Sequence, residues 1–174
     1  HTKKGERGSF VKRQCMHCNS PACVSACPVQ ALMKNPMDGD APGVVNYDKH
    51  KCIGCRYCMV ACPFDVPTFE YDEAFPVIRK CTFCEPRLKE GKATQCATAC
   101  PADAIKFGTQ AQMIAEAKRR INKAPDRYHQ QIYGTKEVGG TSVFYLVHKD
   151  VDEKSEKAFA KLGLQAFDSV AVNE

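Results

Sequence analysis

The chain has 174 residues, a formal net charge of +5, twelve cysteines and no tryptophan. Its length allows one domain or two small ones with a modest core, but not a large substrate-binding body. The basic residues are scattered among acidic ones, which disfavours nucleic-acid binding, and apolar runs such as Val143 to Val147 fall far short of the roughly 18 residues that a membrane-spanning helix needs.

The first half of the chain is predicted to consist of short elements. A basic lead-in at 1–14 ends in a strand-like run at 9–13, and it begins with His1 rather than Met, so we expect a processed or truncated piece. Strand-like pieces at 44–47 and 77–78 precede the second and third groups of cysteines. Alanine-rich stretches around the last cysteine of each group favour a single helical turn.

The cysteines form an internal repeat of three blocks, each of which ends in Cys-x3-Cys-Pro. The flanks repeat too, since residues 10–15 parallel 76–81 and residues 27–32 parallel 100–105, and duplication is the simplest explanation. The three blocks are Cys15, Cys18, Cys23 and Cys27; Cys52, Cys55, Cys58 and Cys62; and Cys81, Cys84, Cys96 and Cys100.

The second block has the spacing of a bacterial ferredoxin. Cys-x2-Cys-x2-Cys-x3-Cys-Pro over 52–63 places thiolates on one tight loop around a [4Fe–4S] cube, and in two-cluster ferredoxins the fourth cysteine ligates the other cluster. The first block widens one gap to four residues and the third widens it to eleven, residues 85–95, which we expect to form an exposed loop. We predict an α+β fold of tandem bacterial-ferredoxin-like modules, a polyferredoxin domain, over 1–107.

Beyond Phe107 the cysteines stop, and we predict a C-terminal helix and strand extension over 108–174. Residues 110–122 are predicted to form an amphipathic helix with Met113, Ile114, Ala117 and Ile121 on one side. The run 142–147 suits a strand, and the charged stretch 150–161 suits a solvated helix. We expect this extension to dock on the cluster domain or on a partner.

Zinc sites and a disulfide framework are the alternative uses of twelve cysteines. Zinc favours Cys-x2-Cys pairs with longer spacers, and secreted disulfide scaffolds are usually much shorter chains. The repeated Cys-x3-Cys-Pro ending favours clusters instead. Because no Ser–His–Asp set, phosphate-binding glycine loop or open metal position is found in the sequence, we assign no catalytic residue and expect electron transfer rather than enzymatic activity.

Other residues near the cysteines receive supporting roles. His17 can donate a hydrogen bond to a cluster sulfur, although a packing role is favoured, and structural roles are expected for His50, His129 and His148. Arg56 and Tyr57 are expected to shield a cluster or to face a partner. An apolar shell that excludes water from the clusters is predicted to consist of Val29, Ile53, Val60, Phe64 and Ile105.

At these blocks the sequence resembles the four-cluster ferredoxin subunits of membrane-associated respiratory oxidoreductases, such as formate dehydrogenase, dimethyl sulfoxide reductase and hydrogenase-2. The likeness to the hydrogenase-2 ferredoxin subunit is the greatest. The residues that carry the resemblance lie at 13–18, 52–63, 107–109, 139–146 and 161–164. It implies an electron relay between a catalytic subunit, of hydrogenase or molybdopterin type, and an integral membrane quinone-reactive subunit, at the periplasmic face of the cytoplasmic membrane.

The resemblance also implies a ligand pairing. Cys15, Cys18 and Cys23 would share one cube with Cys62, and a second cube would take the thiols of Cys52, Cys55, Cys58 and Cys27. The family has four cysteine blocks, and this chain lacks the first one, with which the third would exchange its last ligand. Either Cys100 therefore closes a third cluster with Cys81, Cys84 and Cys96, or an upstream segment supplies the ligands for a fourth. A free soluble polyferredoxin that serves several donors is the alternative function.

Overall fold

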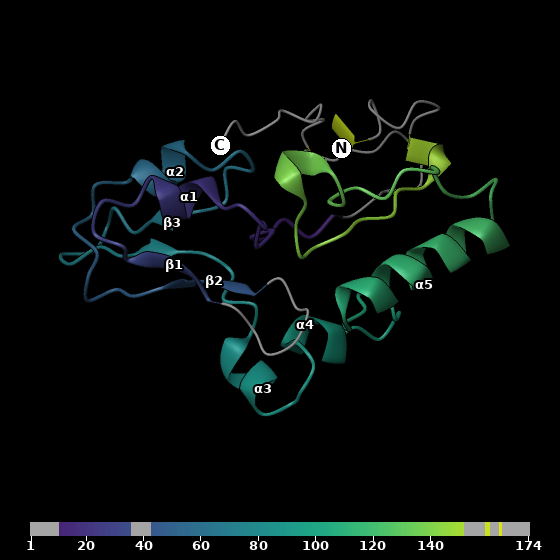
Figure 1. Ribbon diagram of the computed structural model, residues 1–174, viewed down its shortest axis with the longest axis horizontal. Coiled ribbons are helices and arrows are strands. Elements are labelled where there is room, and N and C mark those ends of the chain that lie inside the picture. Colours follow the sequence, from purple (N-terminus) through teal and green to yellow (C-terminus); the bar gives the residue numbers. More distant parts are fainter. Residues whose placement is uncertain (1–10, 36–42, 152–158, 161–163, 165–174) are drawn as a thin grey trace.

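The computed structural model describes residues 11–35, 43–151, 159–160 and 164 (Figure 1). These residues form short helices and two small two-stranded sheets, which agrees with a small ferredoxin-like α+β domain. The elements are α1 (Ala22–Ser25), β1 (Leu32–Asn35), β2 (Val44–Tyr47), α2 (Tyr57–Val60), β3 (Thr68–Phe69), β4 (Ile78–Arg79), α3 (Glu85–Lys89), α4 (Gln95–Thr98), α5 (Gln110–Lys123), η1 (Glu137–Gly139) and η2 (Lys149–Val151). None of the described helices is long and apolar enough to cross a membrane.

Both sheets are antiparallel pairs that flank the cysteines. Strand β2, predicted at 44–47, is confirmed and pairs with β1, while the strand predicted at 77–78 is found one residue later as β4, which pairs with β3. The partner strands β1 and β3 were not predicted. Leu32, Val45 and Ile78 are buried in one hydrophobic cluster together with Cys58, so the sheets place apolar side chains directly against a cysteine.

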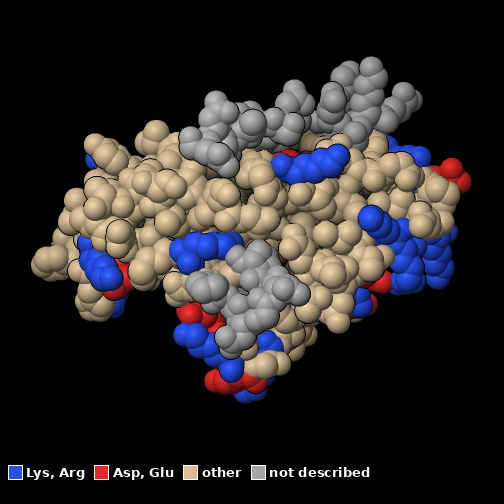
Figure 2. All heavy atoms as spheres, in the orientation of Figure 1, with Lys and Arg blue, Asp and Glu red and all other residues tan. Residues whose placement is uncertain are grey.

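Helix α5 is the longest described helix and is close to its predicted bounds. Its N-terminus carries a capping box, in which the Gln112 N–H donates to Thr109 Oγ1 over 3.3 Å and the Thr109 N–H donates to Gln112 Oε1 over 3.0 Å. Ala117 and Ile121 are buried against Ile132, as the amphipathic pattern predicted. On the face shown in Figure 2, Lys and Arg side chains gather over α5.

The prediction of a strand over 142–147 is wrong. The segment makes only an isolated bridge between Tyr145 and Tyr133, because its backbone bonds in several directions: the Ser142 N–H donates to the Met16 carbonyl over 3.0 Å, and the Val143 N–H donates to Thr141 Oγ1 over 3.4 Å. Its pairing with residues 129–133 is limited to Tyr145, which exchanges bonds with Tyr133, and to the Val147 carbonyl, which accepts the His129 N–H, so no continuous ladder forms. In the predicted strand at 9–13, residues 11–13 form no strand and the rest lies outside the described residues. Most of the charged stretch 150–161 also lies outside them.

The insertion at 85–95 contains a helix and not only a loop. Pro86 lies in the first turn of α3, where its missing N–H costs nothing, and Glu85 pairs with Lys89 one turn later over 2.8 Å. Gly91, with a φ of +70°, follows the helix end. The prediction of an exposed loop is therefore only partly correct, because the insertion also contains the sequence features that stabilise a short helix.

The C-terminal extension and the first cysteine block share one hydrophobic core. Met16 is buried against Tyr133 and Val143, with Phe159 in the same cluster. Backbone bonds join the same two segments, since the Asn19 N–H donates to the Gly140 carbonyl over 3.0 Å. The extension is thus packed on the cysteine-containing part over residues far apart in the sequence.

A buried turn holds this packing together. Gly134 has a φ of +98°, its carbonyl accepts the Thr141 N–H over 2.8 Å, and its N–H donates to the buried Glu137 carboxylate over 2.6 Å. A Cβ at Gly134 would lie 2.1 Å from the Val143 carbonyl oxygen, which is backbone and has no freedom to move aside. The turn therefore requires glycine for both its backbone conformation and its close contact.

We predict that Gly134→Ala lowers the free energy of unfolding by at least about 3 kcal/mol, because it combines an unfavourable φ with a backbone clash. Gly139→Ala is the matched control: its φ of +80° is also positive, but nothing lies within 4 Å of the added Cβ. The control should cost only about 1–2 kcal/mol. Thermal unfolding followed by circular dichroism measures both, and equal losses would contradict this account of the turn.

Candidate metal centres

The backbone around the cysteines repeats from block to block. A helical turn, α1, α2 or α4, ends two residues before the last cysteine of each block. The third residue after that cysteine has a positive φ in every block, at Gln30 (52°), Asp65 (49°) and Asp103 (52°). A second positive φ recurs two residues after the first cysteine, at His17, Gly54 and Phe83. These left-handed positions curl the chain tightly around each group of thiols.

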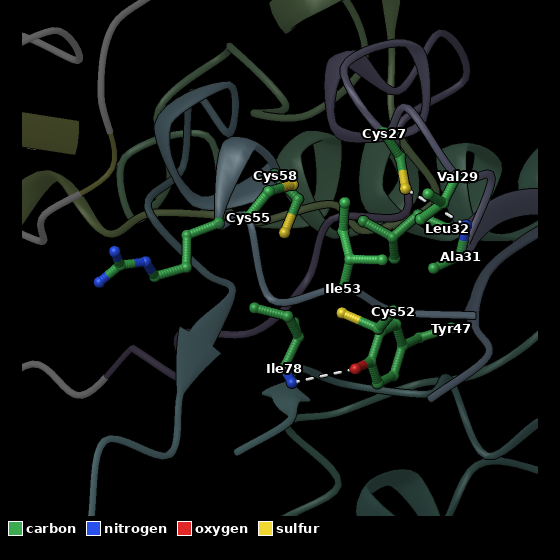
Figure 3. A pocket seen from close by; sticks show the side chains of 11 residues that line it. Cys27, Val29, Ala31, Leu32, Tyr47, Cys52, Ile53, Cys55, Cys58 and Ile78 are labelled. Atoms are coloured by element: carbon green, nitrogen blue, oxygen red, sulfur yellow. Dashed lines mark hydrogen bonds between the residues drawn. The ribbon is translucent and has the colours of Figure 1, made fainter. Parts of the chain in front are cut away.

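One pocket brings together cysteines from the first two blocks (Figure 3). Cys27 enters it from the end of the first block, and Cys52, Cys55 and Cys58 enter from the second. The sulfurs labelled in Figure 3 lie around a common space, together with the side chains of apolar neighbours. The pocket has about 310 Å³ of empty space and is also lined by Val29, Ala31, Leu32, Tyr47, Ile53, Arg56 and Ile78.

A second pocket contains the complementary set of thiols. Cys15, Cys18 and Cys23 come from the first block and Cys62 comes from the end of the second, around about 370 Å³ of empty space. The rest of the lining is mainly apolar and includes Lys80, the one lysine in it: Met16, Pro21, Ala22, Val45, Pro63, Phe64, Val66, Pro67 and Lys80. Each pocket is thus lined by three cysteines of one block and the last cysteine of the other.

Backbone N–H groups donate to several of the thiols. Ala31 donates to Cys27 over 3.2 Å, and Gly54 donates to Cys52 over 3.4 Å. Burial alone would raise the pKa of Cys27, but the surrounding N–H groups outweigh it and the pKa is lowered. Such donors favour the thiolate, which is the form that ligates iron. A pocket with these donors is therefore suited to hold charged sulfur ligands.

Other thiols favour the protonated form: the pKa of Cys58 in the first pocket is raised, and so are those of Cys15, Cys18 and Cys23 in the second. Burial, and then the neighbouring thiols, raise the pKa of Cys18 to about 12 and that of Cys23 to about 11. Four thiolates this close repel one another, and a positively charged metal centre removes that repulsion. The donor set fits a [4Fe–4S] cluster in both pockets, with four sulfur ligands and an apolar wall.

A single metal ion fits less well. Within the part of the chain that the structure describes, no three His, Cys, Asp or Glu side chains are arranged to hold one ion. A zinc ion requires every ligand within about 2.0–2.3 Å of one point. Thiols that surround a wider pocket instead suit a cluster of several irons.

The third block contributes to neither pocket. Its first and last cysteines repeat the bonds seen in the earlier blocks: the Phe83 N–H donates to Cys81 over 3.4 Å, and the Ala104 N–H donates to Cys100 over 3.3 Å, as Ala31 does to Cys27. The remaining thiols are bonded within the block, where Cys84 accepts the Gln95 N–H over 3.4 Å and Cys96 lies 3.5 Å from Thr94 Oγ1.

His17 is fully buried between the first and third blocks. Its Nδ1 accepts the Val45 N–H over 3.1 Å, and its ring packs on Phe83 with centroids 4.7 Å apart. Burial, and then the nearby Lys80 and Lys34, lower its pKa to about 3, so the ring is neutral with its proton on Nε2. Nε2 forms no hydrogen bond within the described residues, and His17 lines neither pocket, so its hydrogen bond to a cluster sulfur stays a prediction.

The other histidines have local contacts. His148 packs on Tyr128 and lies 3.5 Å from Asp150, and the backbone N–H of His50 donates to Asp48 over 2.9 Å. His129 is buried and its N–H donates to the Val147 carbonyl. None of them lines either cysteine pocket.

The predicted apolar shell is only partly correct. Val60, the last residue of α2, is 89% exposed and lines neither pocket, whereas Ile53 lines the first pocket although it is 65% exposed. Val29 and Phe64 do line the pockets, as do Leu32, Val45 and Ile78, which were not predicted. Ile105 is half-buried and lines neither pocket.

Arg56 and Tyr57 lie at the surface beside the first pocket. Tyr57 is 60% exposed, and the Arg56 guanidinium lies 5.7 Å from the ring centroids of both Phe69 and Tyr71. This position is compatible with shielding a cluster or facing a partner.

Comparison with known proteins identifies relatives for most of the chain. It is 41% identical over 163 residues to the hydrogenase-2 operon protein HybA of Escherichia coli O157:H7, covering 79% of this chain and 48% of that protein. It is 37% identical over 139 residues to the iron-sulfur subunit of the nitrate-inducible formate dehydrogenase of Escherichia coli K12, covering 79% and 45%. A protein of Nitratidesulfovibrio vulgaris is 52% identical over 138 residues, covering 79% and 36%.

The chain thus spans about a third to a half of the length of these relatives. The resemblance identified from the cysteine motifs is confirmed, since one relative is a hydrogenase-2 operon protein and another is the iron-sulfur subunit of a formate dehydrogenase. Residues 7–110, more than half of the chain, match the family described as the 4Fe-4S dicluster domain. The chain therefore belongs to the 4Fe-4S dicluster domain family.

Proposed function

We propose that this chain is an electron-transfer subunit that relays electrons through [4Fe–4S] clusters. The observation that carries the proposal is the grouping of eight cysteines around two pockets, each lined by four thiols from two different blocks. When bound, a cluster accepts or gives up one electron at a time. The chain itself supplies the thiolates, the N–H donors that stabilise them and the apolar walls that exclude water.

The proposed ligands are all twelve cysteines. Cys15, Cys18, Cys23 and Cys62 would hold one cluster, and the other pocket would use Cys27, Cys52, Cys55 and Cys58. The backbone features that recur in each block support an arrangement as tandem ferredoxin-like modules. With four thiolates on each cluster, no metal position is left open for a substrate, so the role is transfer and not catalysis.

For the third block we infer an exchange with an upstream segment. Cys100 has the same N–H···S bond as Cys27, the cysteine that reaches into the neighbouring block's pocket. By this parallel, Cys100 would serve a cluster outside its own block, and Cys81, Cys84 and Cys96 would receive a ligand from elsewhere. The complete protein would then hold four clusters, whereas a local third site would make three.

The proposed partners are a catalytic oxidoreductase subunit, of hydrogenase or molybdopterin type, and an integral membrane quinone-reactive subunit. Support comes from the named relatives, which belong to a hydrogenase-2 operon and to a formate dehydrogenase. The proposed location is the periplasmic face of the cytoplasmic membrane, through these partners. Residues 108–174 would complete the cluster domain at 1–107 and offer a docking surface.

We predict that ligand variants fall into two groups by the cluster they affect. Cys62→Ser should alter the same electron paramagnetic resonance signal as Cys23→Ser, while Cys27→Ser should alter the same signal as Cys58→Ser, because each pair lines one pocket. The measurement uses the reduced protein with iron counted in parallel. A Cys62→Ser variant that disturbs the Cys58 signal would show that the pairing is wrong.

Iron and acid-labile sulfide counts on the intact native protein test the upstream segment. We expect about sixteen irons, which corresponds to four clusters of four irons each. A count of about twelve would support three clusters held by these cysteines alone and would overturn the exchange.

Isolation of the native complex through a tag on this chain tests the partners. We expect a larger catalytic subunit and a membrane subunit to co-purify, and we expect externally added protease to reach the chain in spheroplasts. A clean monomer on gel filtration, with no catalytic subunit present, would favour the free soluble polyferredoxin instead.

A further inference from the structure

Two lysine side chains are fixed beside the second cysteine pocket. Lys34 Nζ donates to the backbone carbonyls of Cys18, over 2.7 Å, and of His17, over 3.1 Å. Lys80 Nζ donates to the carbonyls of Val45 and of Cys81, the latter over 3.2 Å. Both lysines are half-buried, so their ammonium groups are held by the backbone of the site and are not free in solvent.

Neither ammonium has a carboxylate partner within the described residues, unlike the surface lysines Lys89, Lys92 and Lys106, which pair with Glu85, Glu90 and Asp103. Their charges act on the thiols instead. Lys80 lines the pocket itself, and Lys34 is bonded to the backbone of Cys18, one of the four cysteines around it. Two half-buried cations thus stand beside the thiols of this pocket, where they are placed as counter-ions to whatever negative charge the pocket holds.

The first pocket has a different electrostatic environment. Its basic lining residue, Arg56, is exposed, and the guanidinium lies over Phe69 and Tyr71. A solvent-exposed charge is screened by water and salt far more than a half-buried one. The two lysines therefore distinguish the second pocket from the first.

We propose that Lys34 and Lys80 are built-in counter-ions of the cluster held by Cys15, Cys18, Cys23 and Cys62, and that they raise its reduction potential. This inference rests on the proposed function. A [4Fe–4S] cluster with four thiolates goes from a net charge of about −2 to about −3 when it takes one electron. The electron comes from a neighbouring cluster, which is oxidised by one electron, and no proton or bond is exchanged.

The physical reason is that a nearby positive charge stabilises the more negative, reduced state more than the oxidised one. Because the two ammonium groups are held by backbone carbonyls, they need not reorganise when the electron arrives. Lys34 and Lys80 would act through the cluster's charge and are positioning residues, not ligands.

The test is a redox titration of the native complex, followed by electron paramagnetic resonance, on Lys34→Met and Lys80→Met variants. Methionine keeps a long apolar side chain and removes the charge. For the second-pocket cluster, we expect each variant to lower the equilibrium constant for one-electron reduction about ten-fold, a shift of about 59 mV to lower potential. The first-pocket cluster, identified through Cys58→Ser, should change much less.

Two controls separate charge from packing. Lys92→Met removes an exposed lysine that pairs with Glu90, and it should leave the reduction potentials of both clusters unchanged. Lys80→Arg keeps the positive charge, so the reduction potential of its second-pocket cluster should lie much closer to the wild-type value than that of Lys80→Met. Clusters present at full occupancy but with unchanged potentials in Lys34→Met and Lys80→Met would overturn this inference alone. A wild-type complex without [4Fe–4S] signals would instead overturn the proposed function.

Discussion

The constraint on which this structure depends is the cost of ionising thiols that the fold buries and brings close together. Burial and neighbouring sulfurs hold the pKa of Cys18 near 12 when no metal is present. Three features of the surrounding structure reduce the cost of holding these thiols as thiolates. Backbone N–H groups donate to the sulfurs, residues with left-handed backbone conformation bend the loops around them, and two lysines lie beside one pocket. Metal binding and folding are therefore parts of one equilibrium in this chain.

The second theme is exchange between segments that are distant in the sequence. Each pocket takes its fourth thiol from the other block, so neither block completes a site alone. The same holds for the hydrophobic core, where Met16 packs against Tyr133 and Val143. A small hydrophobic core that is divided into several groups of residues is more stable when cofactors and side-chain packing both link distant segments.

The cluster-binding repeat, strand β2 and helix α5 could be predicted because each leaves a local signal: fixed cysteine spacing, a β-branched run or an amphipathic period. The sequence could not predict β1 or β3, whose short runs gain stability only from partners. The strand expected at 142–147 failed because Ser142 and Thr141 bond to Met16 and to the local backbone instead. The position of Lys34 and Lys80 beside the second pocket was not predicted, because it is set by tertiary contacts. In the internal repeat, residues 10–15 align with 76–81 and Lys80 aligns with Gln14, so the repeat does not indicate a positive charge beside a thiol.

The bonds from Ser142 to Met16 and His17 have a consequence for biosynthesis. These contacts close a loop of more than a hundred residues and cannot form until Ser142 has left the ribosome. At about 5–20 residues per second, translation from Met16 to Ser142 takes roughly 6–25 s. During that interval the first cysteine block lacks the segment that later covers Met16, so its packing is completed only after most of the chain has been made.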